Sequence, residues 1–116
     1  MKNRVDFYVK IRWNIDFIAD EIKTIDTSKE IREMVERVCS DISLEVLHQI
    51  DTVSDEDIII KLLMQLKKFD LIIRTLENNK EEITAHLLLI THVGDMLHLI
   101  NEEEPELLDR YRRVKK

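Results

Sequence analysis

The sequence has almost none of the residues that interrupt or cross-link a fold. Its 116 residues include one cysteine, one proline and one glycine, and aromatic residues make up only 5%. The single cysteine, Cys39, excludes an internal disulfide and a paired-cysteine metal site, so we expect a buried, inert thiol. One glycine excludes a glycine-rich phosphate-binding loop. With so few residues that break helices, the chain is predicted to form long helices joined by short turns.

Long apolar runs and an excess of basic residues are also missing. The longest apolar runs, 58–60 and 87–90, are far shorter than the roughly 20 residues of a membrane span, so no membrane contact is predicted. A single cysteine without a signal peptide favours the cytoplasm. The net charge of −6 disfavours nucleic-acid binding, because such proteins normally carry a basic face. Basic residues gather only near the C-terminus.

The residues that are abundant predict an all-α protein. Isoleucine, leucine, glutamate and lysine dominate, and the length fits one domain over residues 1–116. Apolar residues recur in alternating steps of three and four, as on one face of a helix. The clearest early series is Tyr8, Ile11, Ile15, Ile18, Ile22 and Ile25. Helices are expected over about 3–25, 28–50, 55–77 and 80–101, with a short helix after Pro105 and a basic tail over about 104–116.

The residues between these segments predict tight turns. Thr27 with Glu30 matches a capping box at the start of the second helix, and Ser54 is expected to cap the third. Asn78 and Asn79 are expected to turn the chain in left-handed geometry and to cap the fourth helix. Such short connections force neighbouring helices to run antiparallel. We therefore predict an antiparallel, up-down-up-down four-helix bundle with a short C-terminal helix.

The third and fourth helices carry more apolar residues than a lone bundle requires. The fourth has two stripes, one through Ile83, Leu87, Ile90 and Leu97 with Gly94 in register, and a second through Leu89, Val93, Met96 and Ile100. Surplus apolar surface usually marks a contact surface, and Gly94 is compatible with close approach of a partner helix. The alternative is that a diagonal neighbour, or the final helix through Leu107, Leu108 and Tyr111, covers the extra stripe within the chain. The predicted interface comprises Ile60, Met64, Leu71, Leu89, Val93, Met96 and Ile100, with Trp13 as a secondary anchor.

One alternative is a metal site. Glu45 precedes His48 by three residues in the second helix, and Asp95 precedes His98 by three in the fourth. This arrangement resembles the carboxylate-bridged di-iron bundles, which use a Glu-x-x-His pair on each of two helices. The resemblance implies that Asp6 and Asp57 supply the remaining carboxylates. The sequence departs from the pattern because one pair has aspartate in place of glutamate.

A second alternative rests on the histidines. His86, His92 and His98 are six residues apart, which turns a helix by about 600°, so they point to three different faces. A small four-helix bundle with an exposed histidine resembles the histidine phosphotransfer domains, and that resemblance implies a phosphoryl carrier. The family's His-x-Leu-Lys-Gly run is absent, since three leucines follow His86.

No catalytic residue and no cofactor-binding residue is predicted from these patterns. The prediction for function is a non-enzymatic helical bundle that binds protein, of the regulator, inhibitor, immunity or adaptor type. The expected partners are a second copy of the chain, giving a homodimer, and a heterologous protein.

Overall fold

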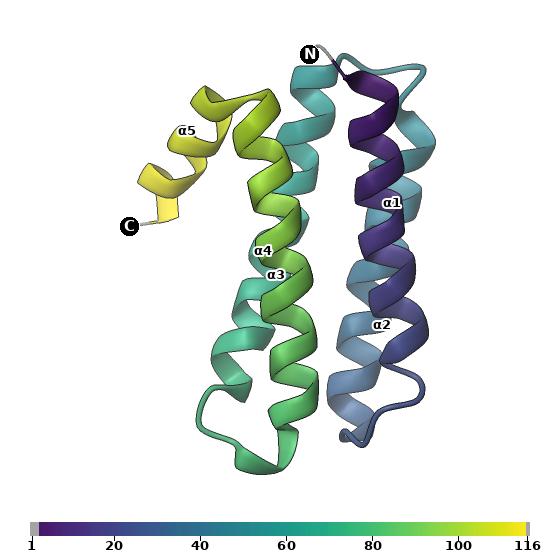
Figure 1. The fold of residues 1–116 in the computed structure, drawn as a ribbon, viewed down its shortest axis with the longest axis vertical. Helices are drawn as coiled ribbons and strands as arrows, with labels where there is room; N and C mark the ends of the chain where they lie inside the picture. Colours follow the sequence, from purple (N-terminus) through teal and green to yellow (C-terminus); the bar gives the residue numbers. More distant parts are fainter. Residues whose placement is uncertain (1–2, 116) are drawn as a thin grey trace.

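The computed structural model describes residues 3–115, with the surroundings of side chains as far as Arg112. It has four long helices and a short C-terminal one, in agreement with the predicted bundle (Figure 1). The long helices are α1 (Arg4–Glu21), α2 (Lys29–Glu45), α3 (Asp55–Leu76) and α4 (Ile83–Glu103), followed by α5 (Pro105–Lys115). Short 3-10 turns, η1 (Leu47–Gln49) and η2 (Lys80–Glu82), follow α2 and precede α4.

The four long helices form a ring of antiparallel neighbours. α1 packs against α2 and α4, and α3 packs against the same two helices, so α1 stands diagonally opposite α3 and α2 opposite α4. α5 begins at Pro105, as predicted, and folds back against α3 and α4. It covers only the end of α4 nearest to it (Figure 1).

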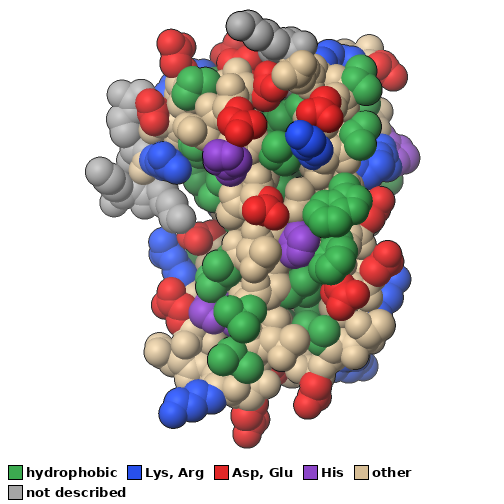
Figure 2. Space-filling model, viewed as in Figure 1, with side chains coloured by type: hydrophobic (Ala, Val, Ile, Leu, Met, Phe, Trp, Pro, Cys, Tyr) green, Lys and Arg blue, Asp and Glu red, His purple; other side chains and the backbone are tan. Residues whose placement is uncertain are grey.

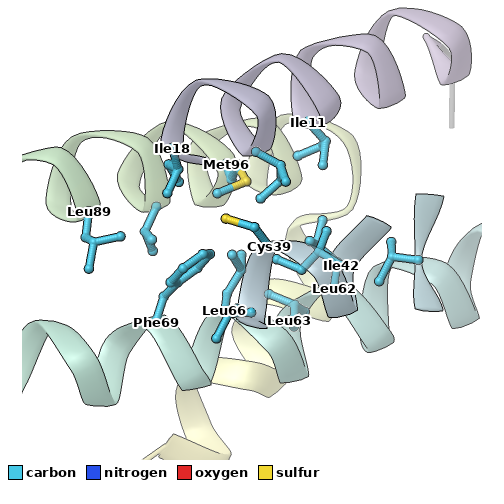
Figure 3. Close-up of a cluster of buried hydrophobic side chains, with 14 of the residues drawn as sticks. Ile11, Ile18, Cys39, Ile42, Leu62, Leu63, Leu66, Phe69, Leu89 and Met96 are labelled. Carbon is cyan, nitrogen blue, oxygen red and sulfur yellow. The ribbon is translucent and has the colours of Figure 1, made fainter. Parts of the chain in front are cut away.

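All four long helices contribute side chains to the core. The predicted α1 series is confirmed from Tyr8 to Ile22, whereas Ile25 is only partly buried. Cys39 lies among these apolar side chains, also as predicted. Figure 3 shows how the side chains meet in the centre of the ring; those labelled are Ile11, Ile18, Cys39, Ile42, Leu62, Leu63, Leu66, Phe69, Leu89 and Met96.

The first turn differs from its prediction. Ser28, in extended geometry, is the N-cap of α2, and its hydroxyl accepts a hydrogen bond from the Ile31 N–H at 3.3 Å. The Thr27 hydroxyl instead donates to the carboxylate of Glu82, which also accepts from the Ser28 N–H at 3.0 Å. The predicted Thr27 and Glu30 capping box is therefore wrong. The buried Glu82 carboxylate fastens the first turn to the start of α4.

The other turns are closer to expectation. The Ser54 hydroxyl accepts from the Asp57 N–H at 3.2 Å, which confirms its capping role. The side chain of Asn79 accepts from the Glu81 N–H at 3.1 Å, so it caps η2 rather than α4 itself. Left-handed geometry in this turn was a wrong prediction, because none of the described non-glycine residues has a positive φ.

The start of α1 is fastened to the turn between α2 and α3. The Asp55 carboxylate accepts from the Tyr8 hydroxyl at 2.7 Å and from Arg4 Nε at 3.0 Å. Arg4 also donates to the Ile50 carbonyl oxygen. The hydrogen bonds from Tyr8 and Arg4 hold the pKa of Asp55 below its ordinary value, while burial and Asp55 raise the pKa of Tyr8. This network ties three segments together at one end of the bundle.

The composition of α4 sets it apart from the other helices. The stretch Lys80–Glu103 has a mean hydropathy of 1.4 and is long and apolar enough to span a membrane by length and composition alone. Only 33% of that stretch's apolar window is buried. A core helix of a bundle meets the same criterion, and α4 packs along both α1 and α3. The absence of membrane contact therefore stays a prediction.

Candidate functional site

The α4 half of the predicted interface lies inside the protein. Leu89, Val93, Met96 and Ile100 are at most 6% exposed and belong to the core, so their assignment to a partner surface is wrong. Leu107, Leu108 and Tyr111 of α5 are buried in the same cluster. The two stripes of α4 have similar spacing and composition. The packing of α1 and α3 decides which of them faces inward.

The α3 half of the predicted interface is at the surface. Ile60, Met64 and Leu71 expose 37%, 61% and 63% of their area. Ile60 and Met64 line a shallow groove between α3 and α5, whereas Leu71 lies in a separate groove between α2 and α3, beside Met34. We call Ile60, Met64 and Leu71 the α3 surface. Its members do not form one continuous patch, and that limits its value as a single contact site.

A more continuous apolar surface runs along α1. Val5, Val9, Trp13 and Phe17 recur every four residues, the spacing of a ridge on a helix. They expose 73%, 60%, 58% and 38% of their area, and we call them the α1 ridge. Figure 2 shows hydrophobic side chains following this helix on the visible face of the molecule. Of the four, only Trp13 was predicted as an anchor.

The aromatic part of the ridge is held in place by α4. The Trp13 and Phe17 rings lie 5.6 Å apart between centroids, and His92 of α4 lies 4.6 Å from Phe17 and 5.9 Å from Trp13. Separations of this size are typical of packed aromatic pairs. Trp13 is therefore exposed on one side and supported on the other.

The support depends on a buried polar pair. His92 Nδ1 lies 2.8 Å from Asn14 Oδ1, and Asn14 Nδ2 donates to the Lys10 carbonyl at 2.9 Å. Since the amide nitrogen of Asn14 is the donor in the second bond, its oxygen is the acceptor in the first. His92 Nδ1 must then carry the proton. Burial lowers the pKa of His92, with the Asp95 carboxylate opposing this effect, so the ring is neutral at pH 7.

The stripe of α4 that faces outward is the first one, which the predicted interface did not include. Ile83, Leu87 and Ile90 expose 57%, 56% and 44% of their area, Gly94 is exposed, and Leu97 is partly buried. We call these five residues the α4 stripe. In Figure 2 hydrophobic side chains gather over the first half of α4, apart from those that follow α1. The two apolar surfaces are thus distinct.

The residues of the metal alternative are not brought together. α2 and α4 stand diagonally across the bundle, and no group of three or more potential ligands occurs among the described residues. Glu45 accepts a hydrogen bond from Gln65 at 2.8 Å, and His98 pairs with Glu102 at 2.9 Å. Glu45 and His98 therefore have other partners, and the described structure does not gather Glu45, His48, Asp95 and His98 as a di-iron site would require.

The surroundings of His98 and Cys39 do not favour reactivity. His98, on the surface, is held by the Glu102 carboxylate, which places negative charge where an incoming phosphoryl group would lie. Burial, assisted by Glu36 and Asp16, raises the pKa of the Cys39 thiol to about 12. A thiol with such a pKa is a poor nucleophile near neutral pH.

Comparison with protein-family models, curated proteins and solved structures gives no match to this chain.

Proposed function

We propose that this protein is a non-enzymatic interaction module that works by stoichiometric binding of other proteins. The observation that carries the proposal is the exposed Trp13, with 58% of its area accessible and its ring packed beside Phe17 and His92. Tryptophan is enriched among the residues that dominate binding energy at interfaces. A ring already fixed by neighbours loses little conformational freedom on binding.

The surroundings of the reactive side chains support binding rather than catalysis. His92 is committed to Asn14, Cys39 is protonated near neutral pH, and Glu45 and His98 are engaged locally. None of these groups combines exposure, a perturbed pKa and a reactive neighbour, the features expected of a catalytic centre.

The position of the apolar surfaces favours a regulator or adaptor. The α1 ridge and the α3 surface belong to helices that stand diagonally opposite each other. One protein bound to the ridge would leave the α3 surface and the α4 stripe free for a second contact. Homodimer formation remains part of the proposal.

Site-specific photo-cross-linking in cells tests the proposal. A photoreactive amino acid replaces Val9, next to Trp13, or Leu71 on the α3 surface, and the control position is Lys29, whose exposed side chain belongs to neither surface. A defined one-to-one adduct from Val9 that is absent from Lys29 supports the α1 ridge. An adduct from Leu71 alone transfers the site to α3, and identical background labelling at all three positions contradicts a binding role for both surfaces.

Binding of the purified partner then measures the contribution of Trp13. Truncation of a central interface tryptophan typically costs at least about 2 kcal/mol, which corresponds to a loss of affinity of roughly 30-fold. Trp13→Ala should produce that loss while the far-ultraviolet circular dichroism is unchanged, because Trp13 exposes 58% of its area and is not among the core residues. An affinity unchanged by this substitution would argue against the ridge.

A further inference from the structure

The groove between α3 and α5 is lined mainly by apolar side chains. α5 packs on the bundle through Leu107, Leu108 and Tyr111, which are at most 8% exposed. It covers only one side of α3, so Ile60 and Met64 remain 37% and 61% exposed. The groove beside them has a volume of about 280 Å³, and its lining consists of Ile60, Leu63, Met64, Lys67, Leu107, Arg110 and Tyr111.

Both charged residues of this lining are basic, although the protein as a whole has a net charge of −6. Arg110 pairs with Glu56 at 3.2 Å, one helical turn before Ile60. Lys67 follows Leu63 by one turn, so it lies at the opposite end of the α3 side of the groove. The charge of Arg110 is therefore offset within the chain.

The charge of Lys67 is not offset in this way. Its Nζ atom lies 5.4 Å from the centroid of the Tyr111 ring, and no ion pair of Lys67 occurs within the part of the chain that the structure describes. Asp70, three residues further along α3, pairs with Arg74 at 3.4 Å. The apolar groove thus ends at an ammonium group that is steadied by an aromatic ring and can still bind an anion.

We propose that this groove binds a small amphiphilic anion, with its alkyl chain along Ile60, Leu63 and Met64 and its acid group at Lys67. Small-molecule sites are generally apolar with a few polar groups that fix the orientation of the ligand. The groove is slightly smaller than the roughly 300–1,000 Å³ of pockets for drug-sized ligands, so its size favours a short chain such as that of octanoate. This site goes beyond the proposed function, because it shares no residue with the α1 ridge.

The shape of the groove sets the expected strength. It is shallow and leaves much of Met64 exposed, so a ligand stays partly in water. We expect a dissociation constant on the order of 1 mM for octanoate. An ion pair at an exposed site improves affinity by about 2- to 5-fold. The acid group should therefore determine selectivity more than strength.

Methyl nuclear magnetic resonance of the intact protein, titrated with sodium octanoate up to about 20 mM, tests the site. Saturable shifts are expected at the methyl groups of Ile60, Leu63, Met64 and Leu107. Octylammonium has the same chain with the opposite charge and should bind at least about 4-fold more weakly, since it replaces attraction to Lys67 with repulsion. Acetate, which has the acid group without the chain, should cause no saturable shift.

Charge reversal identifies the residue that selects the anion. Lys67→Glu should reverse the preference, so that octylammonium binds more tightly than octanoate, and Lys67→Gln should weaken octanoate by about 2- to 5-fold. The matched control is Lys68→Glu, which makes the same change at an exposed position that lines the groove between α2 and α3. It should leave the preference for octanoate unchanged. Lys67 is only partly buried, so its variants are expected to fold, and circular dichroism checks this.

Four results would overturn the assignment: no saturable shift up to about 20 mM octanoate, equal affinities for octanoate and octylammonium, a preference unaffected by Lys67→Glu, or equally strong shifts at the α1 ridge and the α4 stripe. The last result would mean adsorption to any exposed apolar side chain. None of them bears on the proposed function, which is tested by cross-linking from Val9. Conversely, Trp13→Ala should leave the affinity for octanoate unchanged.

Discussion

Replacement of Glu82 by alanine should destabilise the protein, because it removes the link between the first turn and the start of α4. The carboxylate accepts hydrogen bonds from the Thr27 hydroxyl and the Ser28 N–H, and only 7% of the residue is exposed. A hydrogen bond to a charged group contributes about 1.5–3 kcal/mol. Since Thr27 is partly exposed, water can take the place of Glu82 as a hydrogen-bond partner and reduce the cost. We expect a decrease in the free energy of unfolding of about 2–3 kcal/mol, roughly 10 °C in melting temperature.

Urea unfolding followed by circular dichroism measures this change, and two neighbours provide controls. Glu81→Ala removes an exposed side chain of the same charge and should cost less than about 0.5 kcal/mol. Glu30→Ala should be equally mild, whereas a true capping box with Thr27 would make it cost about 1 kcal/mol.

A double-mutant cycle isolates the contact itself. Thr27→Val combined with Glu82→Ala should give a coupling energy of at least about 1 kcal/mol, because both substitutions remove the same hydrogen bond. Equal stabilities of the Glu82→Ala and Glu81→Ala variants, or a coupling energy near zero, would refute the proposed tie between the first turn and α4.

Two further predictions follow from His92 and Cys39. Burial lowers the pKa of His92 below the ordinary histidine value of about 6.5, so the unfolded chain binds more protons there and stability should fall as the pH drops through this range. Between about pH 7.5 and about pH 5.5, the free energy of unfolding in urea should decrease more for the wild type than for His92→Gln. Equal decreases would contradict the lowered pKa of His92. Because the pKa of Cys39 is raised to about 12, its thiol should react with a disulfide reagent at mildly alkaline pH only after unfolding. Rapid reaction of the folded protein would show that the site opens readily.

Much of the architecture was predictable because it depends on local patterns. The α1 series, the Ser54 cap and the start of α5 at Pro105 each follow from residues close together in sequence. The N-cap of α2 was predicted one residue too early, at Thr27 instead of Ser28, since both residue types cap helices well. A contact with Glu82, distant in sequence, decides between them.

The candidate surfaces were harder to predict because they depend on which helix faces which. Both stripes of α4 satisfy helical spacing, and only the positions of α1 and α3 select the inner one. The α1 ridge did have a local signal, the four-residue spacing of Val5, Val9, Trp13 and Phe17. The buried pair of His92 and Asn14 had a weaker signal in the sequence. Asn14 stands on the inward side of α1, between Ile11 and Ile18.

The ring of helices has a consequence for the order of folding. Three of its four contacts join helices adjacent in the chain, but α1 and α4 meet through residues as far apart as Asn14 and His92, 78 positions. Closing a loop of that length costs about 1 kcal/mol more than closing one of about 20 residues. The α1–α4 seam is therefore expected to form late, once the other pairs exist. A ligand protein seated on Trp13, whose ring packs beside His92 of α4, would lie along that late seam. It would raise the stability of the whole domain by mass action, in proportion to the logarithm of its concentration.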